Sequence, residues 1–167
     1  AIATVKQKLD GEPLHALVNN AAISPKKLLT PAETSAGVST RMGVSDTSLQ
    51  VWREVMQVNF FSCVMLVTGL VDALRAAVPC GGGSIVNVTS IVGSRVHPFA
   101  GVAYATSKAA LKTLTREMAA EFGQQGLRVN CISPGEINTS ILSPGTQDIV
   151  DREIPMRRLG TTIGGLA

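Results

Sequence analysis

Three short, mostly apolar runs of the chain have the length and composition of β-strands in a parallel sheet. They are residues 14–19 (LHALVN), 84–89 (SIVNVT) and 127–132 (LRVNCI). Turn-forming glycines or prolines stand before each run, at Gly11 and Pro13, at 81–83 and at Gly126. The pattern predicts three buried parallel strands.

Helical patterns fill the longer stretches between these runs. One starts after a cap candidate at Asp46 or Ser48 and covers about 49–78, and its apolar residues spread over more than one stripe. Such a helix needs cover on two sides. A second helical pattern covers about 103–122, and residues 1–9 resemble the end of a helix.

The order of strand, helix, strand, helix, strand predicts a βαβαβ unit with right-handed crossovers. We therefore expect an α/β fold: a partial Rossmann-like, doubly wound parallel sheet with three αβα layers, about half of a full domain and one unit over 1–167. Residues 23–47 have no periodicity and are rich in Ser, Thr, Pro, Gly and Lys, which predicts a long loop. We expect that loop beside the active site.

Composition narrows the class of protein. The 167 residues are 45% hydrophobic and 16% charged, which suits one globular domain. A net charge of +3 is compatible with an anionic ligand, whereas scattered basic residues and six aromatic residues give little support to nucleic-acid binding. The uncharged stretch 55–71 is short of the ~20 apolar residues of a membrane span, so we interpret it as a buried helix with no membrane partner. Three cysteines without CxxC spacing argue against a disulfide framework and a zinc site, and favour a cytoplasmic location.

Tyr104 and Lys108 are the most specific chemical signal. A spacing of four on a helix places a phenol and an ammonium on one face. A nearby cation is expected to lower the pKa of the phenol from about 10, so that it can exchange a proton near neutral pH. Ser90 lies just past the second strand, where open α/β sheets bind ligands, although a serine there is also a common cap.

Five motifs together resemble those of the short-chain dehydrogenase/reductase family, in the family's order. They are Asn19-Asn20-Ala21-Ala22, Val58-Asn59-Phe60, the segment 85–90, Tyr104-Ala-Thr-Ser-Lys108 and the segment 128–135. The resemblance implies an NAD- or NADP-dependent oxidoreductase in which hydride moves between the nicotinamide C4 and the carbinol carbon of an alcohol or ketone substrate.

The resemblance also implies the site residues. Tyr104 would be the general acid/base, Lys108 would lower its pKa and hold the nicotinamide ribose, Ser90 would orient the substrate oxygen and Asn59 would anchor a relay water. Asn59 has a structural alternative as a polar residue inside a helix, and Thr139 has one as a helix cap. The implied cofactor contacts are Asn19, Ala21, Ala22, Tyr104, Lys108, Pro134, Gly135, Ile137 and Thr139; no metal is implied.

Some features depart from the family pattern. Ala22 replaces a glycine, which is tolerable if its φ is negative, and Ser90 and Tyr104 are one residue further apart than is common. We expect His97, in the loop between them, at the surface, with a place facing substrate as the alternative. No Gly-x-x-x-Gly-x-Gly or Gly-x-Gly-x-x-Gly motif occurs, and the end after Gly160 looks truncated or frameshifted.

Two other functions remain open at this stage. The chain is alternatively an inactive remnant that acts as an interaction module, or a reductase-fold epimerase or dehydratase. Because family members commonly dimerise through the two long helices, the resemblance also implies a homodimer or homotetramer. The substrate and the choice between NAD and NADP are not readable from the chain.

Overall fold

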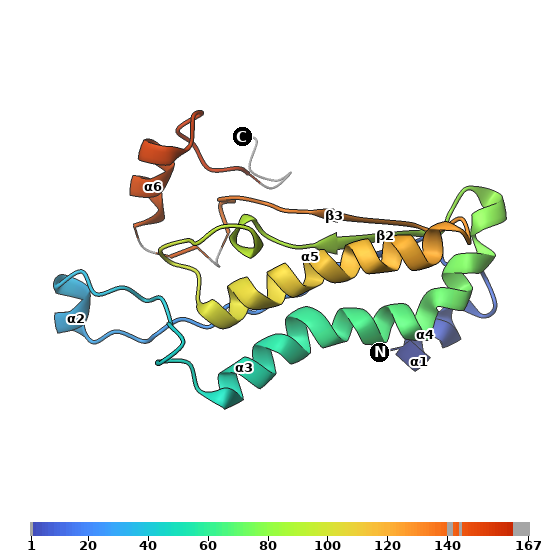
Figure 1. The fold of residues 1–167 in the computed structure, drawn as a ribbon, viewed down its shortest axis with the longest axis horizontal. Helices are drawn as coiled ribbons and strands as arrows, with labels where there is room; N and C mark the ends of the chain where they lie inside the picture. The colour runs from blue at the N-terminus through green and yellow to red at the C-terminus, as the bar shows by residue number, and fades with distance from the viewer. Residues whose placement is uncertain (1, 140–141, 144, 162–167) are drawn as a thin grey trace.

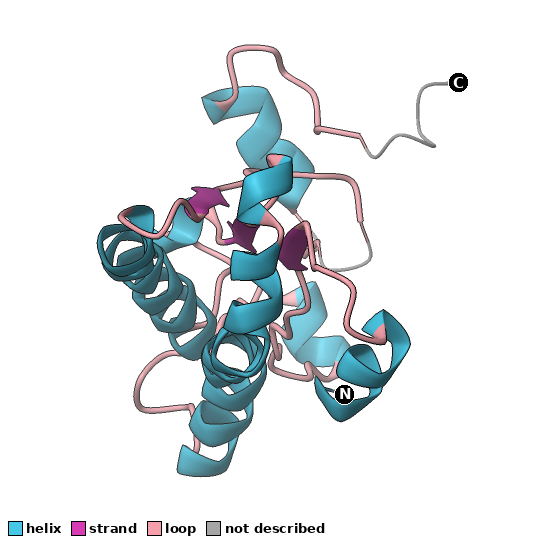
Figure 2. Cartoon of the chain, turned by 90° about the vertical axis from the view of Figure 1, so that its right-hand side faces the viewer, coloured by secondary structure: helices cyan, strands magenta, loops and turns pink. Residues whose placement is uncertain are grey.

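The computed structural model describes residues 2–139, 142–143 and 145–161. Its centre is a parallel sheet of β1 (Ala16–Asn19), β2 (Ser84–Val88) and β3 (Arg128–Ile132), in the order β1-β2-β3. Figure 2 shows the three strands at the centre of the molecule, surrounded by helices. The predicted parallel α/β sheet is confirmed, with boundaries shifted by at most two residues. The unusual end of the sequence, 162–167, lies outside the described residues.

The register of the sheet brings the three strands to a common end. Asn19 pairs with Asn87, and Val88 pairs with Ile132. Because the strands are parallel, the segments that leave their carboxyl ends meet on one side of the sheet. Figure 1 shows α2 (Pro31–Ser35) and α6 (Thr146–Glu153) at that side.

The predicted 49–78 helix is a continuous helical rod with a change of hydrogen bonding in its middle. It consists of α3 (Leu49–Met56), the π-helical turn η1 (Gln57–Phe61) and α4 (Ser62–Ala76), followed by the 3₁₀ turn η2 (Val78–Cys80). A single π turn inside an α-helix is a recurrent feature of functional sites.

Side-chain capping fixes the start of the rod. Ser48, and not Asp46, is the N-cap, and its hydroxyl accepts a hydrogen bond of 3.3 Å from the Val51 N–H. Gly81, with a φ of 77°, ends the helical conformation in the left-handed region that glycine adopts without strain.

Helix α5 (Val102–Gly123) extends along the sheet with the rod beside it, as Figure 1 shows. The hydrophobic core lies between the helices and one face of the sheet. It combines Leu74 of the rod, Phe122 of α5 and Ile85 of β2, all at most 7% exposed. The remaining helices are α1 (Ile2–Leu9), which contacts α4, and the 3₁₀ turn η3 (Ile91–Gly93), which contacts α5.

The two faces of the sheet differ in exposure. On β2, Ile85 and Asn87 point into the core and are fully buried, whereas Ile132 on β3 is 53% exposed. The edge strand β1 is buried on one face only, because its Asn19 is 5% exposed whereas its Val18, on the opposite face, is 59% exposed. A second helical layer over the more exposed face stays a prediction.

The segment 23–47 contains one element that the sequence analysis missed. Helix α2 is a single turn that begins with a capping box, in which Thr30 and Glu33 bond each other's backbone N–H groups. Pro31 takes the first helical position, where its missing N–H has no consequence. The prediction of an entirely irregular loop was therefore wrong.

By length and composition alone, the rod is apolar enough to cross a membrane. Core helices of globular domains meet the same criteria, and the rod buries Val55, Leu70 and Leu74 to 2% exposure or less. The absence of a membrane partner and the self-association through the long helices remain predictions.

We expect Leu74→Ala to lower the free energy of unfolding by about 2–5 kcal/mol, because it removes fully buried atoms and leaves a cavity. Leu49→Ala, on the same rod but at a side chain that is 73% exposed, is the matched control and should stay within about 0.5 kcal/mol. Urea denaturation followed by circular dichroism measures both. Equal effects of the two substitutions would contradict this placement of the core.

Candidate active site

A cavity of about 490 Å³ lies at the carboxyl ends of the three strands. Each strand contributes the residues that follow it, and the first turns of α5 form a further wall. Ligand pockets of proteins are typically about 300–1,000 Å³, and open α/β sheets bind ligands at this end. The lining residues include Asn20, Ala22, Thr89, Ser90, Tyr104, Lys108, Pro134, Gly135, Ile137 and Thr139.

Tyr104 and Lys108 share one face of α5, as their spacing predicts. The Lys108 Nζ lies 5.8 Å from the centre of the Tyr104 ring, and both side chains line the cavity. Lys108 is only 2% exposed, and its ammonium donates a hydrogen bond of 2.7 Å to the carbonyl of Val88 at the end of β2. The strand end thereby fixes the position of the lysine.

Ser90 is the cap that the sequence suggests, and it also lines the cavity. Its Oγ accepts a 3.4 Å hydrogen bond from the Val92 N–H and so caps η3. The side chain of Ser90 also lines the cavity, together with that of Tyr104. The capping bond uses an oxygen lone pair, which leaves the O–H of Ser90 as a donor.

The electrostatics of Tyr104 differ from the sequence-based expectation. Burial raises the pKa of Tyr104 above 10; the nearby Ser90 hydroxyl opposes this shift and the negative charge of Glu136 adds to it. Burial likewise lowers the pKa of Lys108. The net shift is thus opposite in direction to the expected lowering, because desolvation by burial is its largest cause.

Asn59 stands in the π turn of the rod and is fully buried. Its Oδ1 accepts the Ile23 N–H at 2.8 Å, and its Nδ2 donates to the Ile23 carbonyl and to Ser107 Oγ, each at 3.0 Å. Ser107 in turn donates to the carbonyl of Tyr104 at 2.7 Å. The side chain thus joins the chain after β1 to α5. It does not line the cavity, so a relay-water role for Asn59 stays a prediction.

The implied cofactor contacts divide into two groups. Ala22, Pro134, Gly135, Ile137 and Thr139 line the cavity together with Tyr104 and Lys108. Asn19 and Ala21 do not.

Asn19 and Ala21 are kept from the cavity for different reasons. Asn19 is buried beneath the strand ends, where its Nδ2 donates to Asn87 Oδ1 at 2.8 Å, and Ala21 is exposed. Ala22 is not among the residues with positive φ, so an alanine fits there without strain.

His97 is not at the surface, which corrects the sequence-based expectation. The residue is 8% exposed and lines the cavity, with its Nε2 3.0 Å from Glu136 Oε1. Glu136 and Lys26 line the same cavity, and neither was identified from the sequence. The position of Glu136 directly after Pro134-Gly135, at a strand end, was the signal that could have found it.

Comparisons with known proteins agree with this geometry. Residues 1–164 match the family model described as enoyl-(acyl carrier protein) reductase. The chain is 57% identical to an oxidoreductase of the short-chain dehydrogenase/reductase family from Brucella ovis, solved with a partially ordered NAD, with a TM-score of 0.71 over 84% of this chain and 58% of that one. The chain belongs to the short-chain dehydrogenase/reductase family.

Two further relatives extend the comparison. The chain is 54% identical to Protein FixR of Bradyrhizobium diazoefficiens over 96% of its length and 53% of that protein. It is 31% identical to a 3-oxoacyl-[acyl-carrier protein] reductase from Brucella melitensis with bound NAD, with a TM-score of 0.78 over 96% of this chain and 54% of that one. This short-chain dehydrogenase/reductase chain therefore spans about half the length of the relatives it matches.

The residues present are compatible with a dinucleotide that carries ribose hydroxyls into the cavity. Lys108 uses one ammonium hydrogen on Val88, so the other N–H groups of its buried ammonium are available for ribose hydroxyls in the cavity. A side chain built on Gly135 would meet only Ile91 Cδ1, at 3.7 Å, so packing does not by itself require a glycine at this wall. A glycine there leaves space for a ligand.

We expect Asn59→Ala to lower the free energy of unfolding, because the N–H and the carbonyl of Ile23 lose their side-chain partner and Ser107 loses a donor, at about 1–3 kcal/mol for each group left unsatisfied. Hydrogen exchange of the Ile23 amide should accelerate more than that of the core strands. Asn138→Ala, at an exposed asparagine, is the control. Unchanged protection of Ile23 would show that Asn59 does not hold this segment.

The single tyrosine of the chain makes its titration directly measurable by near-ultraviolet phenolate absorbance. We expect a midpoint above 10, lower in Glu136→Gln and higher in Ser90→Ala, with Glu117→Gln on the exposed face of α5 as control. Because the folded chain holds this proton more tightly than the unfolded chain, the free energy of unfolding should fall as the pH rises past about 10. A midpoint below 10 in the folded chain would contradict the dominance of burial.

Proposed function

We propose that this chain carries the catalytic and nicotinamide-side half of an NAD- or NADP-dependent oxidoreductase that interconverts an alcohol and a ketone. The observation that carries the proposal is the convergence of Ser90, Tyr104 and Lys108 on one cavity at the carboxyl ends of the strands. Two solved relatives hold NAD, and one is a 3-oxoacyl reductase, so a carbonyl substrate has support from both chemistry and similarity.

Each side chain has a task in this proposal. The Ser90 O–H would donate a hydrogen bond to the substrate oxygen, and the Tyr104 phenol would donate its proton to that same oxygen. Because the pKa of Tyr104 is raised, the phenol is protonated at neutral pH and ready to act as the acid in carbonyl reduction. The bound dinucleotide supplies the hydride to the carbonyl carbon, or accepts it in the reverse direction.

Lys108 acts on the same proton transfer. Its ammonium is hydrogen-bonded to the Val88 carbonyl, and its Nζ lies 5.8 Å from the centre of the Tyr104 ring. From this position the ammonium stabilises the phenolate that remains after Tyr104 gives up its proton. The net charge of +3 is compatible with an anionic dinucleotide as ligand. We also propose a cytoplasmic location, which is consistent with the three cysteines Cys63, Cys80 and Cys131 being free thiols.

Titration with NADH and NADPH, followed by fluorescence and by thermal unfolding, tests the proposal on the chain itself. We expect saturable binding that raises the melting temperature. Tyr104→Phe should retain this binding and reduce the turnover of ethyl acetoacetate by about 10²- to 10⁴-fold, because it removes the transferred proton.

Two lysine variants show whether the effect of removing Lys108 is specific to its position or follows from the loss of any positive charge on α5. Lys108→Met should weaken NADH binding and turnover together, whereas Lys112→Met, one turn further along α5 and bonded to Ser94, should change neither. A cooperatively folded chain that binds neither cofactor would contradict the proposal and favour the interaction-module alternative. Full turnover by Tyr104→Phe would contradict the role of the phenol.

A further inference from the structure

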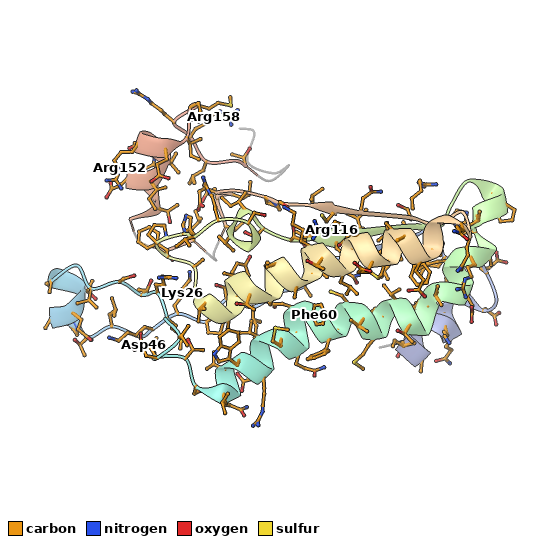
Figure 3. All side chains as sticks on the ribbon, in the orientation of Figure 1. Lys26, Asp46, Phe60, Arg116, Arg152 and Arg158 are labelled. Carbon is orange, nitrogen blue, oxygen red and sulfur yellow. The ribbon has the colours of Figure 1, made fainter. Side chains whose placement is uncertain are left out.

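A second polar cluster lies on the cavity wall apart from Ser90, Tyr104 and Lys108. It joins Lys26 from the segment after β1, His97 from the loop before α5 and Glu136 from the turn after β3. Figure 3 shows Lys26 near the N-terminal end of α5, and its Nζ donates to the Phe99 carbonyl at 2.9 Å. Three separate segments thus converge on the same part of the cavity.

The hydrogen bonding of His97 determines what its ring offers. The Phe99 N–H donates to Nδ1 at 3.3 Å, so Nδ1 holds a lone pair and Nε2 carries the ring hydrogen. Nε2 lies 3.0 Å from Glu136 Oε1, but the contact is not aligned as a hydrogen bond, and the buried Nε2 has no hydrogen-bond partner within the described residues. His97 therefore presents an unused donor at the cavity wall.

A second unused group lines the same cavity. The Ser143 Oγ is buried, and it too is without a hydrogen-bond partner in the part of the chain that is described. Buried polar groups in proteins are nearly always hydrogen-bonded to protein, to water or to a ligand. Two such groups on one cavity, beside the Glu136 carboxylate with a side chain only 11% exposed, indicate a polar ligand.

The charges at this cluster discriminate between ligand classes. A carboxylate ligand would face the carboxylate of Glu136, and an ammonium ligand would face Lys26, whose own pKa burial already lowers. A neutral hydroxyl group can pair with both Glu136 and His97. It donates a hydrogen bond to the Glu136 carboxylate, and its oxygen accepts one from His97 Nε2. Hydrogen bonds to a charged group are also stronger than those between neutral groups.

We propose that His97, Glu136 and Ser143 form a subsite for a second hydroxyl of the substrate, and that the substrate is a neutral diol or hydroxyketone. The inference rests on the proposed function for the other end of the substrate, whose reacting oxygen lies at Ser90 and Tyr104. Glu136 lines the same cavity as Ser90 and Tyr104, so both ends of one small substrate would lie within it. The three residues position and select the substrate, and they take no part in the proton transfer.

The two histidines of the chain provide a direct measurement. His97 lines the cavity and His15 is exposed, so carbon-13-labelled histidine gives one reporter signal and one internal control. The probes are cyclohexane-1,2-diol, cyclohexane-1,3-diol and cyclohexanol. We expect at least one diol to shift the His97 signal saturably, with a Kd about tenfold or more below that of cyclohexanol, while His15 is unaffected.

Substitutions then test the specific contacts. Glu136→Gln should remove most of the preference for the diol over cyclohexanol, and Glu117→Gln should keep it. Thermal unfolding confirms that each variant is folded, and the comparison of diol with cyclohexanol on the unsubstituted chain stands even if a variant does not fold. Equal affinities for diols and cyclohexanol, or no shift of His97 with any probe, would overturn the inference and leave water as the partner of these groups.

The outcome is separable from that of the proposed function. A chain that discriminates the diol but binds no NADH or NADPH would support the subsite and contradict the proposed oxidoreductase activity of this chain. A chain that binds the cofactor but does not discriminate the diol would overturn the subsite alone.

Discussion

The arrangement of the site depends on one buried amide, that of Asn59. Its three hydrogen bonds connect the π turn of the rod with both backbone groups of Ile23 and with Ser107 on α5. Ser107 lies between Tyr104 and Lys108 on that helix, and it bonds the Tyr104 carbonyl. Because unpaired polar groups in the core are costly, this network fixes the segment that leaves β1 relative to the helix that carries the candidate catalytic pair.

Burial sets the electrostatics at the other end of the same network. Lys108 is held at 2% exposure by the carbonyl of Val88, and Tyr104 lies beside it with its pKa raised by desolvation. Burying an ammonium and a phenol at a cavity wall costs desolvation free energy, which lowers the stability of the fold. The cost is consistent with a functional site, where perturbed pKa values are concentrated.

Sequence patterns predicted the parts of the structure that depend on local rules. The three strands follow from short apolar runs, and the meeting of Tyr104 with Lys108 follows from a helical spacing of four. Helix α2 was missed although its signals, Thr30, Pro31 and Glu33, are a capping box with proline at the first position.

Other features depend on tertiary contacts that no spacing reveals. His97 was expected at the surface, and it is buried because a carboxylate more than thirty residues later, Glu136, comes from the end of another strand to meet it. Lys26 reaches the same wall from a segment without periodicity. The opposite sign of the pKa shift at Tyr104 has the same origin, since burial is a property of the folded chain and not of the Tyr–Lys spacing.

The most direct test of the central claim is to compare two halves of the dinucleotide as separate ligands. Titration calorimetry of the chain with nicotinamide mononucleotide and with adenosine monophosphate measures which half the cavity accepts. We expect the nicotinamide half to bind the tighter of the two by about tenfold or more, and Lys108→Met to remove that preference. Equal or tighter binding of adenosine monophosphate, or no binding of either by the folded chain, would contradict the assignment of this cavity as the nicotinamide side of the site.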